Sequence, residues 1–343
     1  MKISLGGRLV GDGEPCLIVA EIGENYNGDA DIACAMIQQA SLAGADAVKF
    51  QTITAEELFN PSSPRYARRK RVELDLLHYP RLLETARTNK VIFFSTPFDE
   101  PSADFLDGLG VPFFKIGSGE LTHHALLRHV ARKGKPMVVS TGMSQQEQID
   151  AAVRVVKDAG NDQIIIAHCI SVYPAAPGMA NVRAVPALRE RLGVLTGFSD
   201  HTISSSAAMA AVALGACYVE KHFTISRALP EGDNDMSVEP QEFKALAQGI
   251  REVESALGTG HRLLLPEERA LVQAARRAIY ARVAIPSGQM IKPDMLAVRR
   301  PYSEIPADQI DLVVGRTARV DIAAEEALRW DQIAKLRLKR LIP

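Results

Sequence analysis

Polar side chains that could do chemistry recur along the first two-thirds of the chain. Each lies at or just after the end of a short apolar run, and the set includes carboxylates, lysines, hydroxyls and imidazoles. These positions are Glu21, Lys49 with Gln51, Ser95-Thr96, Lys115 with Ser118, Ser140-Thr141, His168, Ser199-Asp200-His201 and Glu220-Lys221-His222. One such residue alone would be an ordinary solvated loop position. Polar residues at the ends of all eight runs indicate an active site.

Two of these residues, His201 and His222, follow successive runs at the same depth. A single histidine in such a place is more often a packed core residue than a metal ligand. Two imidazoles on neighbouring strands can share one divalent ion and leave open positions for water and a substrate oxygen. The pair therefore favours a catalytic metal site over a structural one.

The lysines among these residues suggest an anionic substrate. Lys115 begins a turn rich in Gly and Ser, and Ser140-Thr-Gly142 has the same character. Backbone N–H groups in such turns cradle anions, while a lysine such as Lys49 or Lys115 supplies a point charge for phosphate or carboxylate. A Schiff-base lysine is the competing role. A metal site beside two lysines fits anion binding better.

The carboxylates Glu21 and Glu220 are candidates for general acid–base chemistry or for holding sugar hydroxyls. The consecutive residues Ser199, Asp200 and His201 cannot form a catalytic triad by adjacency, because neighbouring residues of a strand point to opposite sides. The chemistry must instead come from residues on different strands.

The runs that carry these residues are rich in Val, Ile and Phe and are typical of strands buried on both faces. We expect them at Leu17–Ile22, Ala47–Gln51, Val91–Ser95, Pro112–Ile116, Pro136–Ser140, Gln163–His168, Gly193–Phe198 and Ala216–His222. Helical patterns separate them, among them Asp31–Leu42, a segment opening on a Ser144-Gln-Gln-Glu147 capping box, and Ser204–Leu214. Alternation of eight strands with helices predicts a (β/α)8 barrel, with catalytic residues at the carboxyl ends of the strands. A doubly wound sheet is the alternative, but no Gly-x-Gly-x-x-Gly follows the first run.

The last part of the chain has a different texture. A helix with Phe243, Leu246 and Ile250 on one face ends at Gly258, and short β-type runs with several prolines begin near Ala278. The segment 285–296 aligns with 322–333 at an offset of 37 residues, which predicts a small β-rich domain with internal pseudo-twofold symmetry. We expect a barrel over 1–262, a linker over 263–282 and this domain over 283–343.

Composition narrows the class of protein. The 343 residues include 40 basic and 41 acidic side chains, which argues against a nucleic-acid binder. The four cysteines lack CxxC spacing, and the amino-terminal segment has no long apolar stretch, so we expect a cytoplasmic protein. The longest small-apolar run, 207–219, is too short to span a membrane.

These residues lie in short motifs that resemble the sialic acid synthase family, which includes N-acetylneuraminate, legionaminate and pseudaminate synthases. The matching motifs are Ala20-Glu-Ile-Gly23, Val48-Lys-Phe-Gln51, Ser95-Thr-Pro-Phe98, Lys115-Ile-Gly-Ser-Gly-Glu120, Ser140-Thr-Gly-Met143, His168-Cys-Ile-Ser-Val-Tyr-Pro174, Phe198-Ser-Asp-His-Thr202 and Glu220-Lys-His-Phe-Thr224. Ile285-Pro-Ser-Gly and Val298-Arg-Arg-Pro301 resemble the family's antifreeze-like (SAF) domain. The resemblance implies a (β/α)8 TIM barrel followed by a small β-rich SAF domain of the β-clip type.

The resemblance also implies a reaction. C3 of phosphoenolpyruvate (PEP) attacks the open-chain aldehyde of an N-acylated hexosamine, such as N-acetylmannosamine; water then adds at C2 and phosphate leaves. The product is a nonulosonic, sialic-type acid. The SAF domain implies a domain-swapped homodimer in which each SAF domain caps the partner barrel.

Residue roles follow from the same resemblance. PEP would be bound by Lys49, Thr96, Lys115, Ser118 and Ser140. The sugar would be contacted by Glu21, Tyr173, Ser199, Asp233 and Arg300, the last reaching across to the partner. The catalytic residues would be Glu21, Glu220 and His222, with Glu220 as the main proton carrier. His201 and His222 would hold a divalent metal, Mn2+ in preference to Mg2+ or Co2+.

Three features depart from the family pattern. Tyr302-Ser-Glu304 replaces the usual loop glycines, and Glu231-Gly-Asp-Asn234 keeps only Asp233 of a common stretch. Residues 53–77 include an arginine-rich stretch that matches no family motif, and we expect them to form a solvated or mobile lid rather than a grip on a sugar phosphate. Alternatives are another PEP-dependent synthase of a seven- or eight-carbon keto acid, a metal-dependent hydrolase, or a catalytically silent sugar-binding protein.

Overall fold

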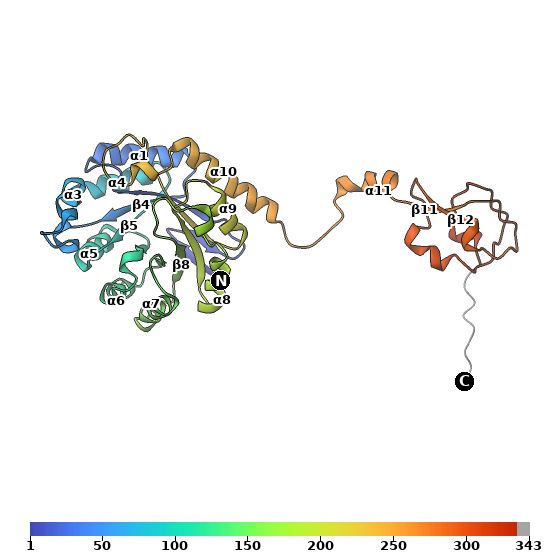
Figure 1. The fold of residues 1–343 in the computed structure, drawn as a ribbon, viewed down its shortest axis with the longest axis horizontal. Coiled ribbons are helices and arrows are strands. Elements are labelled where there is room, and N and C mark those ends of the chain that lie inside the picture. Colours follow the sequence, from blue (N-terminus) through green and yellow to red (C-terminus); the bar gives the residue numbers. More distant parts are fainter. Residues whose placement is uncertain (335–343) are drawn as a thin grey trace. The chain divides into compact units, whose positions relative to one another are not determined.

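The computed structural model of the chain describes residues 1–334 and divides it into two compact units (Figure 1). The first unit is Met1–Thr259, and the second begins at Gly260. The predicted linker at 263–282 stays a prediction, and residues 335–343 of the predicted last domain lie outside the described residues. Among the described residues, no helix combines the length and apolar character needed to cross a bilayer.

An eight-stranded parallel sheet forms the first unit, in the spatial order β5-β4-β3-β10-β9-β8-β7-β6. Its strands are β3 (Leu17–Gly23), β4 (Ala47–Thr52), β5 (Ile92–Pro97), β6 (Phe114–Ile116), β7 (Met137–Ser140), β8 (Ile164–Cys169), β9 (Leu195–Asp200) and β10 (Tyr218–His222). Strand β10 pairs with both β9 and β3, so the last strand joins the first. The end strands β5 and β6 lie beside each other, although they are not neighbours in the hydrogen-bonded strand order, so the barrel is nearly closed. The predicted (β/α)8 barrel is confirmed, and a doubly wound sheet is excluded.

Helices cover the outside of the barrel (Figure 1). They include α1 (Ala30–Leu42), α4 (Tyr79–Thr88), α5 (Glu100–Leu109), α6 (His124–Ala131), α7 (Gln146–Asp158), α8 (Ala184–Leu192), α9 (Ser206–Ala213) and α10 (Pro240–Leu257). The predicted capping box was placed one residue too early. Gln145 is the N-cap of α7, and its backbone N–H donates to the side chain of Gln148. Ser144 donates its hydroxyl to the carbonyl of Gly142 instead.

An amino-terminal hairpin, which the sequence patterns did not reveal, closes the amino-terminal end of the barrel. Its strands β1 (Lys2–Leu5) and β2 (Arg8–Gly11) pair antiparallel. Ile3, Leu5 and Val10 share one buried apolar cluster with inward residues near the strand starts, including Leu17 and Leu195. Burial of these apolar side chains makes the lower half of the barrel a packed core rather than a channel.

Side chains at the carboxyl ends of the strands separate into an inward and an outward set, because alternate residues of a strand face opposite sides. Asp200 and Lys221 belong to the outward set and form a buried ion pair of 2.8 Å. Lys221 also donates to the carbonyl of Thr202, and Asp200 accepts from the backbone N–H of that residue. His168 also faces outward, with its ring stacked on Phe198. These three polar strand ends therefore serve the packing of the barrel wall.

The second unit contains α11 (Arg269–Ala275) and a short antiparallel pair, β11 (Ala278–Ala281) and β12 (Leu296–Arg299). Its core is an apolar cluster of its own: Ile279, Ala281, Ile285, Ile291, Leu296, Ile305, Val313, Ala318, Ile322, Leu328 and Ile333. The unit therefore has the separate hydrophobic core that defines a domain.

The predicted internal repeat in this unit corresponds to a real structural symmetry. Ile285 and Ile322, which are equivalent in the repeat, exchange two backbone hydrogen bonds of 2.9 Å with each other. Equivalent positions Gly288 and Glu325 both have positive φ, at 84° and 67°. The equivalent segments Pro293–Met295 and Trp330–Gln332 both form a turn of 3-10 helix. Two copies of one motif therefore pair around a pseudo-twofold axis.

The outward ion pair supplies a test of the fold. We predict that Lys221→Met lowers the free energy of unfolding of the barrel by about 3–5 kcal/mol, because it leaves the carboxylate of Asp200 buried without its partner. Urea unfolding followed by circular dichroism measures the change. Arg87→Met is the control, because its pair with Glu84 is exposed and its loss should cost less than about 1 kcal/mol. A barrel transition in Lys221→Met unchanged from that of wild type would contradict this role.

Candidate active site

The inward polar residues form a buried layer at the carboxyl end of the barrel, with Glu220 at its centre. Lys115 Nζ donates to both carboxylate oxygens of Glu220, at 2.9 and 2.8 Å. Ser199 Oγ donates at 3.1 Å, and the hydroxyl of Tyr218 donates as well. Donors from strands β6, β9 and β10 thus converge on one carboxylate, which holds the layer together.

The position of Tyr218 depends on a glycine in the neighbouring strand. A Cβ atom on Gly197 would lie 2.8 Å from the Cβ of Tyr218 and 2.7 Å from its carbonyl oxygen. Only a residue without a side chain leaves room there for the tyrosine ring inside the barrel. The glycine in β9 therefore supports the hydrogen bond that Tyr218 donates to Glu220.

Lys49 connects this centre to a second carboxylate. Its Nζ lies 2.8 Å from Glu21 and 3.7 Å from Glu220, and it donates to Thr96 Oγ1 at 3.2 Å. Gln51 Nε2 donates to the other oxygen of Glu21 at 2.9 Å. Two lysines and two carboxylates therefore alternate across the layer, and their formal charges balance.

The two carboxyl groups have different proton affinities. Burial alone would raise the pKa of Glu220, but the charges of Lys115 and Lys49 outweigh it and lower that pKa below its usual range. Burial raises the pKa of Glu21, against the attraction of Lys49 and with the repulsion of Glu220. Neighbouring carboxyl groups whose pKa values diverge are suited to different tasks in acid–base chemistry. Here Glu220 is the fixed anion and Glu21 accepts a proton more readily.

Hydroxyl groups and a backbone N–H lie around the lysines. Gly142 N donates to Ser118 Oγ at 3.0 Å, so the turn after β7 is fastened to the turn after β6. A Cβ on Gly142 would lie 2.1 Å from Ser171 Oγ and 2.7 Å from Ser118 Oγ, so any side chain here would displace these hydroxyls. Ser140 Oγ is buried without a hydrogen-bond partner among the described residues. Such an orphaned hydroxyl is available to an incoming polar ligand.

The two histidines lie together above this layer. The rings of His201 and His222 are 5.3 Å apart, and Tyr173 packs against both, with its centroid 4.1 Å from His201 and 5.9 Å from His222. The carbonyl of Ile170 lies 2.7 Å from His201 Nδ1, which leaves Nε2 of that ring available. The two imidazoles therefore lie close together, as the sequence predicts, and their role as metal ligands stays a prediction.

Their surroundings fit a metal with few protein ligands. Burial lowers the pKa of His222 to about 3, so its ring is neutral, and its Nδ1 is buried without a hydrogen-bond partner among the described residues. A neutral imidazole with an unused lone pair is the form that binds metals. Within residues 1–334, no group of three or more His, Cys, Asp or Glu side chains is arranged to hold an ion. Further ligands of a metal would therefore be water or substrate.

The loop after β10 brings Asp233 to the histidines. Asp233 Oδ2 lies 3.7 Å from His222 Nδ1. The buried side chain of Asn25 holds this loop, since its amide oxygen accepts from Asp233 N at 2.7 Å and its amide nitrogen donates to the carbonyl of Phe223. Asn25 follows the first strand by a short turn, and no motif in the sequence marked it as part of the site.

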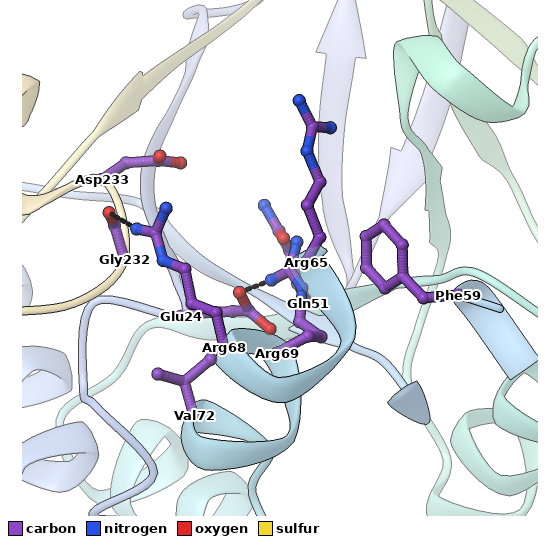
Figure 2. A pocket seen from close by; sticks show the side chains of 9 residues that line it. All are labelled: Glu24, Gln51, Phe59, Arg65, Arg68, Arg69, Val72, Gly232 and Asp233. Carbon is purple, nitrogen blue, oxygen red and sulfur yellow. Dashed lines mark hydrogen bonds and ion pairs between the residues drawn. The ribbon is translucent and has the colours of Figure 1, made fainter. Parts of the chain in front are cut away.

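A pocket of about 220 Å³ opens beside Gln51 and Asp233 (Figure 2). One wall is α3 (Pro64–Val72), which lies in the arginine-rich segment between β4 and β5. The lining residues are Glu24, Gln51, Phe59, Arg65, Arg68, Arg69, Val72, Gly232 and Asp233. Most residues of α3 are exposed, as expected of a solvated segment, and its arginines line this pocket; the mobility of 53–77 stays a prediction.

Most of the predicted site residues lie at two levels of the barrel. The polar layer contains Glu21, Lys49, Thr96, Lys115, Ser199 and Glu220; the mouth above it contains Tyr173, His201, His222 and Asp233. Ser199 lies beside Glu220, one layer below the histidines. Arg300 belongs to the second unit, and its contact with the sugar stays a prediction.

Sequence reasoning missed Tyr218, which was treated as part of an apolar strand, and Cys169, whose Sγ lies 3.5 Å from Ser118 Oγ and 3.8 Å from His201 Nδ1. Strand alternation could have revealed both residues. Tyr218 precedes the inward Glu220 by two positions, and Cys169 follows the inward Ala167 by two.

Comparison with known proteins bears on the whole chain. Residues 36–262 match the NeuB family, and residues 276–334 match the SAF domain. An N,N'-diacetyllegionaminic acid synthase of Legionella pneumophila is 36% identical over 94% of this chain and 96% of its own. An N-acetylneuraminate-9-phosphate synthase of Mus musculus is 34% identical over 95% of both chains.

The fold agrees with these matches. The crystal structure of an N-acetylneuraminic acid synthetase from Leptospira borgpetersenii, in complex with citrate, has a TM-score of 0.75 and 32% identity. The alignment covers 79% of this chain and 95% of that one. The family match extends over more than half of the sequence, and the relatives align over nearly all of it. The chain therefore belongs to the NeuB family and carries a SAF domain after its barrel.

Proposed function

We propose that the protein condenses PEP with an N-acylated hexosamine aldehyde to give a nonulosonic acid and phosphate. The observation that carries this proposal is the pair of buried lysines, Lys49 and Lys115, that converge on Glu220 at the carboxyl end of the barrel. PEP carries a carboxylate and a phosphate, so it needs two cationic groups close together. The legionaminic and neuraminic acid synthases among the relatives support the same substrate class.

PEP would occupy the layer at Lys49, Thr96, Lys115, Ser118 and Ser140. Burial lowers the pKa of Lys115. Burial also acts to lower the pKa of Lys49, but the charges of Glu21 and Glu220 outweigh it, so that pKa is raised. The two carboxylates thus hold both ammonium groups in place before substrate arrives. An anion that adds its oxygens to these ammonium groups meets cations that are already in position.

The sugar aldehyde would lie above PEP, near His201, His222, Tyr173 and Asp233. A divalent ion held by the two histidines, Mn2+ in our proposal, would supply Lewis-acid polarisation of the aldehyde oxygen. The ring of Tyr173 packs against both imidazoles and would form a flat wall against which the sugar can pack. Glu21 lies between this mouth and PEP, because Gln51 at the pocket and Lys49 in the layer both contact it.

Proton transfer is assigned to Glu21 in this proposal. The aldehyde oxygen takes up a proton when the C–C bond forms, and the water that attacks C2 gives one up. Glu220 accepts hydrogen bonds from three side chains and has a lowered pKa, so it is poorly suited to hold that proton. The raised pKa of Glu21 favours it instead as the general acid and base. Glu220 would act as the positioning residue for Lys115.

The assembly and location of the protein are further parts of the proposal. We propose a cytoplasmic homodimer in which Arg300 of each SAF domain meets the N-acyl group of the sugar in the partner barrel. All four cysteines are buried and unpaired, which suits a reducing compartment. Arg300 itself is exposed, as a residue that reaches another chain must be before assembly.

The reaction is tested by phosphate release from PEP with Mn2+ and a panel of N-acetylmannosamine, its 6-phosphate and diacetamido-trideoxyhexoses. We predict release with at least one sugar, abolished by a chelator and reduced at least about a hundredfold by His222→Ala, which removes a proposed metal ligand. His123→Ala is the matched control, because that histidine is half-exposed beside Glu120 and outside this layer. No release with any sugar from folded, metal-loaded protein would refute the proposed reaction.

The assignment of the two carboxylates has a separate test. We predict that Glu21→Gln lowers kcat by about 10²- to 10⁴-fold, because it removes the proton carrier. Glu220→Gln should instead lower the free energy of unfolding by about 3–5 kcal/mol, because it leaves Lys115 buried without a charge partner. Steady-state kinetics and urea unfolding of both variants separate the roles. The reverse outcome, with Glu21→Gln destabilised and Glu220→Gln as stable as wild type, would exchange the two assignments.

A further inference from the structure

The pocket beside the active site has more positive than negative side chains. Helix α3 presents Arg65, Arg68 and Arg69 along one wall; the carboxylate of Glu24 lies among them beside Arg69, and Asp233 lies across the pocket (Figure 2). The pocket is therefore suited to an anion, although the chain as a whole is nearly neutral.

The three arginines differ in how far they are already paired. Arg69 forms an ion pair with the buried Glu24, and its guanidinium lies 6.0 Å from the ring centroid of Phe59. Arg68 donates to the carbonyl of Gly232 at 3.0 Å and to Glu231 at 3.1 Å. The guanidinium of Arg65 has no hydrogen bond or ion pair within the described residues, and it extends into the open part of the pocket (Figure 2). Of the three arginines, Arg65 is therefore the one whose guanidinium is unpaired within residues 1–334.

The rim opposite Arg65 is fastened to the barrel by Asn25. Gly232 has a φ of 75°, and a Cβ there would lie 2.7 Å from Asn25 Oδ1, so the loop requires glycine at this point. Asn25 in turn accepts from Asp233 N and is buried. The carbonyl that positions Arg68 is therefore held by the body of the barrel, and the arrangement of cations exists before any ligand binds.

This pocket adjoins the proposed sugar site at two side chains. Gln51 lines the pocket and donates to Glu21, while Asp233 lines it and lies 3.7 Å from His222. A sugar whose aldehyde carbon lies near Glu21 and His222 would therefore extend its opposite end toward α3. The lysines proposed for PEP lie deeper, in the layer around Glu220, so the two anion sites are distinct.

We propose that Arg65, with Arg68, binds a phosphate ester on the sugar carbon furthest from the aldehyde, so that the substrate is a phosphorylated N-acylhexosamine. This inference rests on the proposed function and specifies its substrate. Guanidinium groups bind phosphate oxygens through paired, charge-assisted hydrogen bonds. A neutral sugar would offer only hydroxyl groups to these cations and would leave the charge of Arg65 unused.

The test compares N-acetylmannosamine with its 6-phosphate at saturating PEP and Mn2+, using the full-length protein. For wild type, kcat/KM is expected to be at least tenfold higher for the phosphorylated sugar. Arg65→Ala should reduce that preference by about 10- to 100-fold, chiefly through KM of the phosphorylated sugar. Arg65→Lys should recover part of the preference, since it keeps the charge but loses the paired geometry.

Lys70→Ala is the matched control. It removes one positive charge from the same helix, but Lys70 pairs with Glu56 and Glu73 and does not line the pocket. Its sugar preference should equal that of wild type. Equal effects of Lys70→Ala and Arg65→Ala would show general electrostatic attraction and overturn the assignment of Arg65.

The outcomes also separate this inference from the reaction itself. Turnover of N-acetylmannosamine or a diacetamido sugar at least as efficient as that of the 6-phosphate would refute the phosphate site and leave the synthase reaction standing. Turnover of no sugar would refute the synthase reaction. A preference for the 6-phosphate that persists in Arg65→Ala would move phosphate recognition elsewhere in the protein.

Discussion

The buried carboxylate of Glu220 is the constraint on which the site depends. A charge in the interior of a barrel is costly unless it is paired and fully hydrogen-bonded. Lys115, Ser199 and Tyr218 meet that requirement, and Lys49 lies close enough to add its charge. The consequence for function is that two ammonium groups are held side by side without substrate, at the place where the barrel opens.

The rest of the first unit makes this layer possible. Below it, side chains of the amino-terminal hairpin and inward apolar residues of the strands form one packed apolar cluster. Above it, His201 and His222 lie beside Tyr173, and the loop held by Asn25 adds Asp233. Helix α3 then forms the outer wall of the pocket. Along the barrel axis, the apolar core is therefore followed by the layer of charged side chains, and then by the histidines and the pocket.

Much of this arrangement could be predicted from the sequence, because it follows from two local rules. Apolar runs that alternate with helices specify the barrel, and period-two alternation within a strand specifies which polar residues face inward. Glu21, Lys49, Lys115 and Glu220 were found by their places at the ends of the apolar runs, and alternation explains why they face inward. Asp200, Lys221 and His168 obey the same rule and face the helices instead.

What the sequence did not reveal depends on contacts between distant segments. The hairpin strands β1 and β2 carry no pattern that shows where they pack, and Asn25 acquires its role only through the loop it meets after β10. The arginine-rich segment is largely exposed, as the sequence predicts, but its contacts at the pocket were not foreseen. Its helix α3 lies at the mouth of the barrel, where Arg68 forms an ion pair with Glu231 and Arg69 forms one with Glu24. The capping error at α7 has a local cause. Ser144 with Glu147 and Gln145 with Gln148 both have capping-box spacing, and the helix begins after Gln145.

The central claim is that the two lysines around Glu220 form a PEP site. Isothermal titration calorimetry of PEP against the full-length protein, without sugar, tests it most directly, with Lys115→Met beside wild type. We predict that wild type binds PEP and that Lys115→Met binds it at least about tenfold more weakly, because one charge-assisted contact is lost. Equal PEP affinity in the two proteins, with Lys115→Met shown to be folded, would contradict the claim.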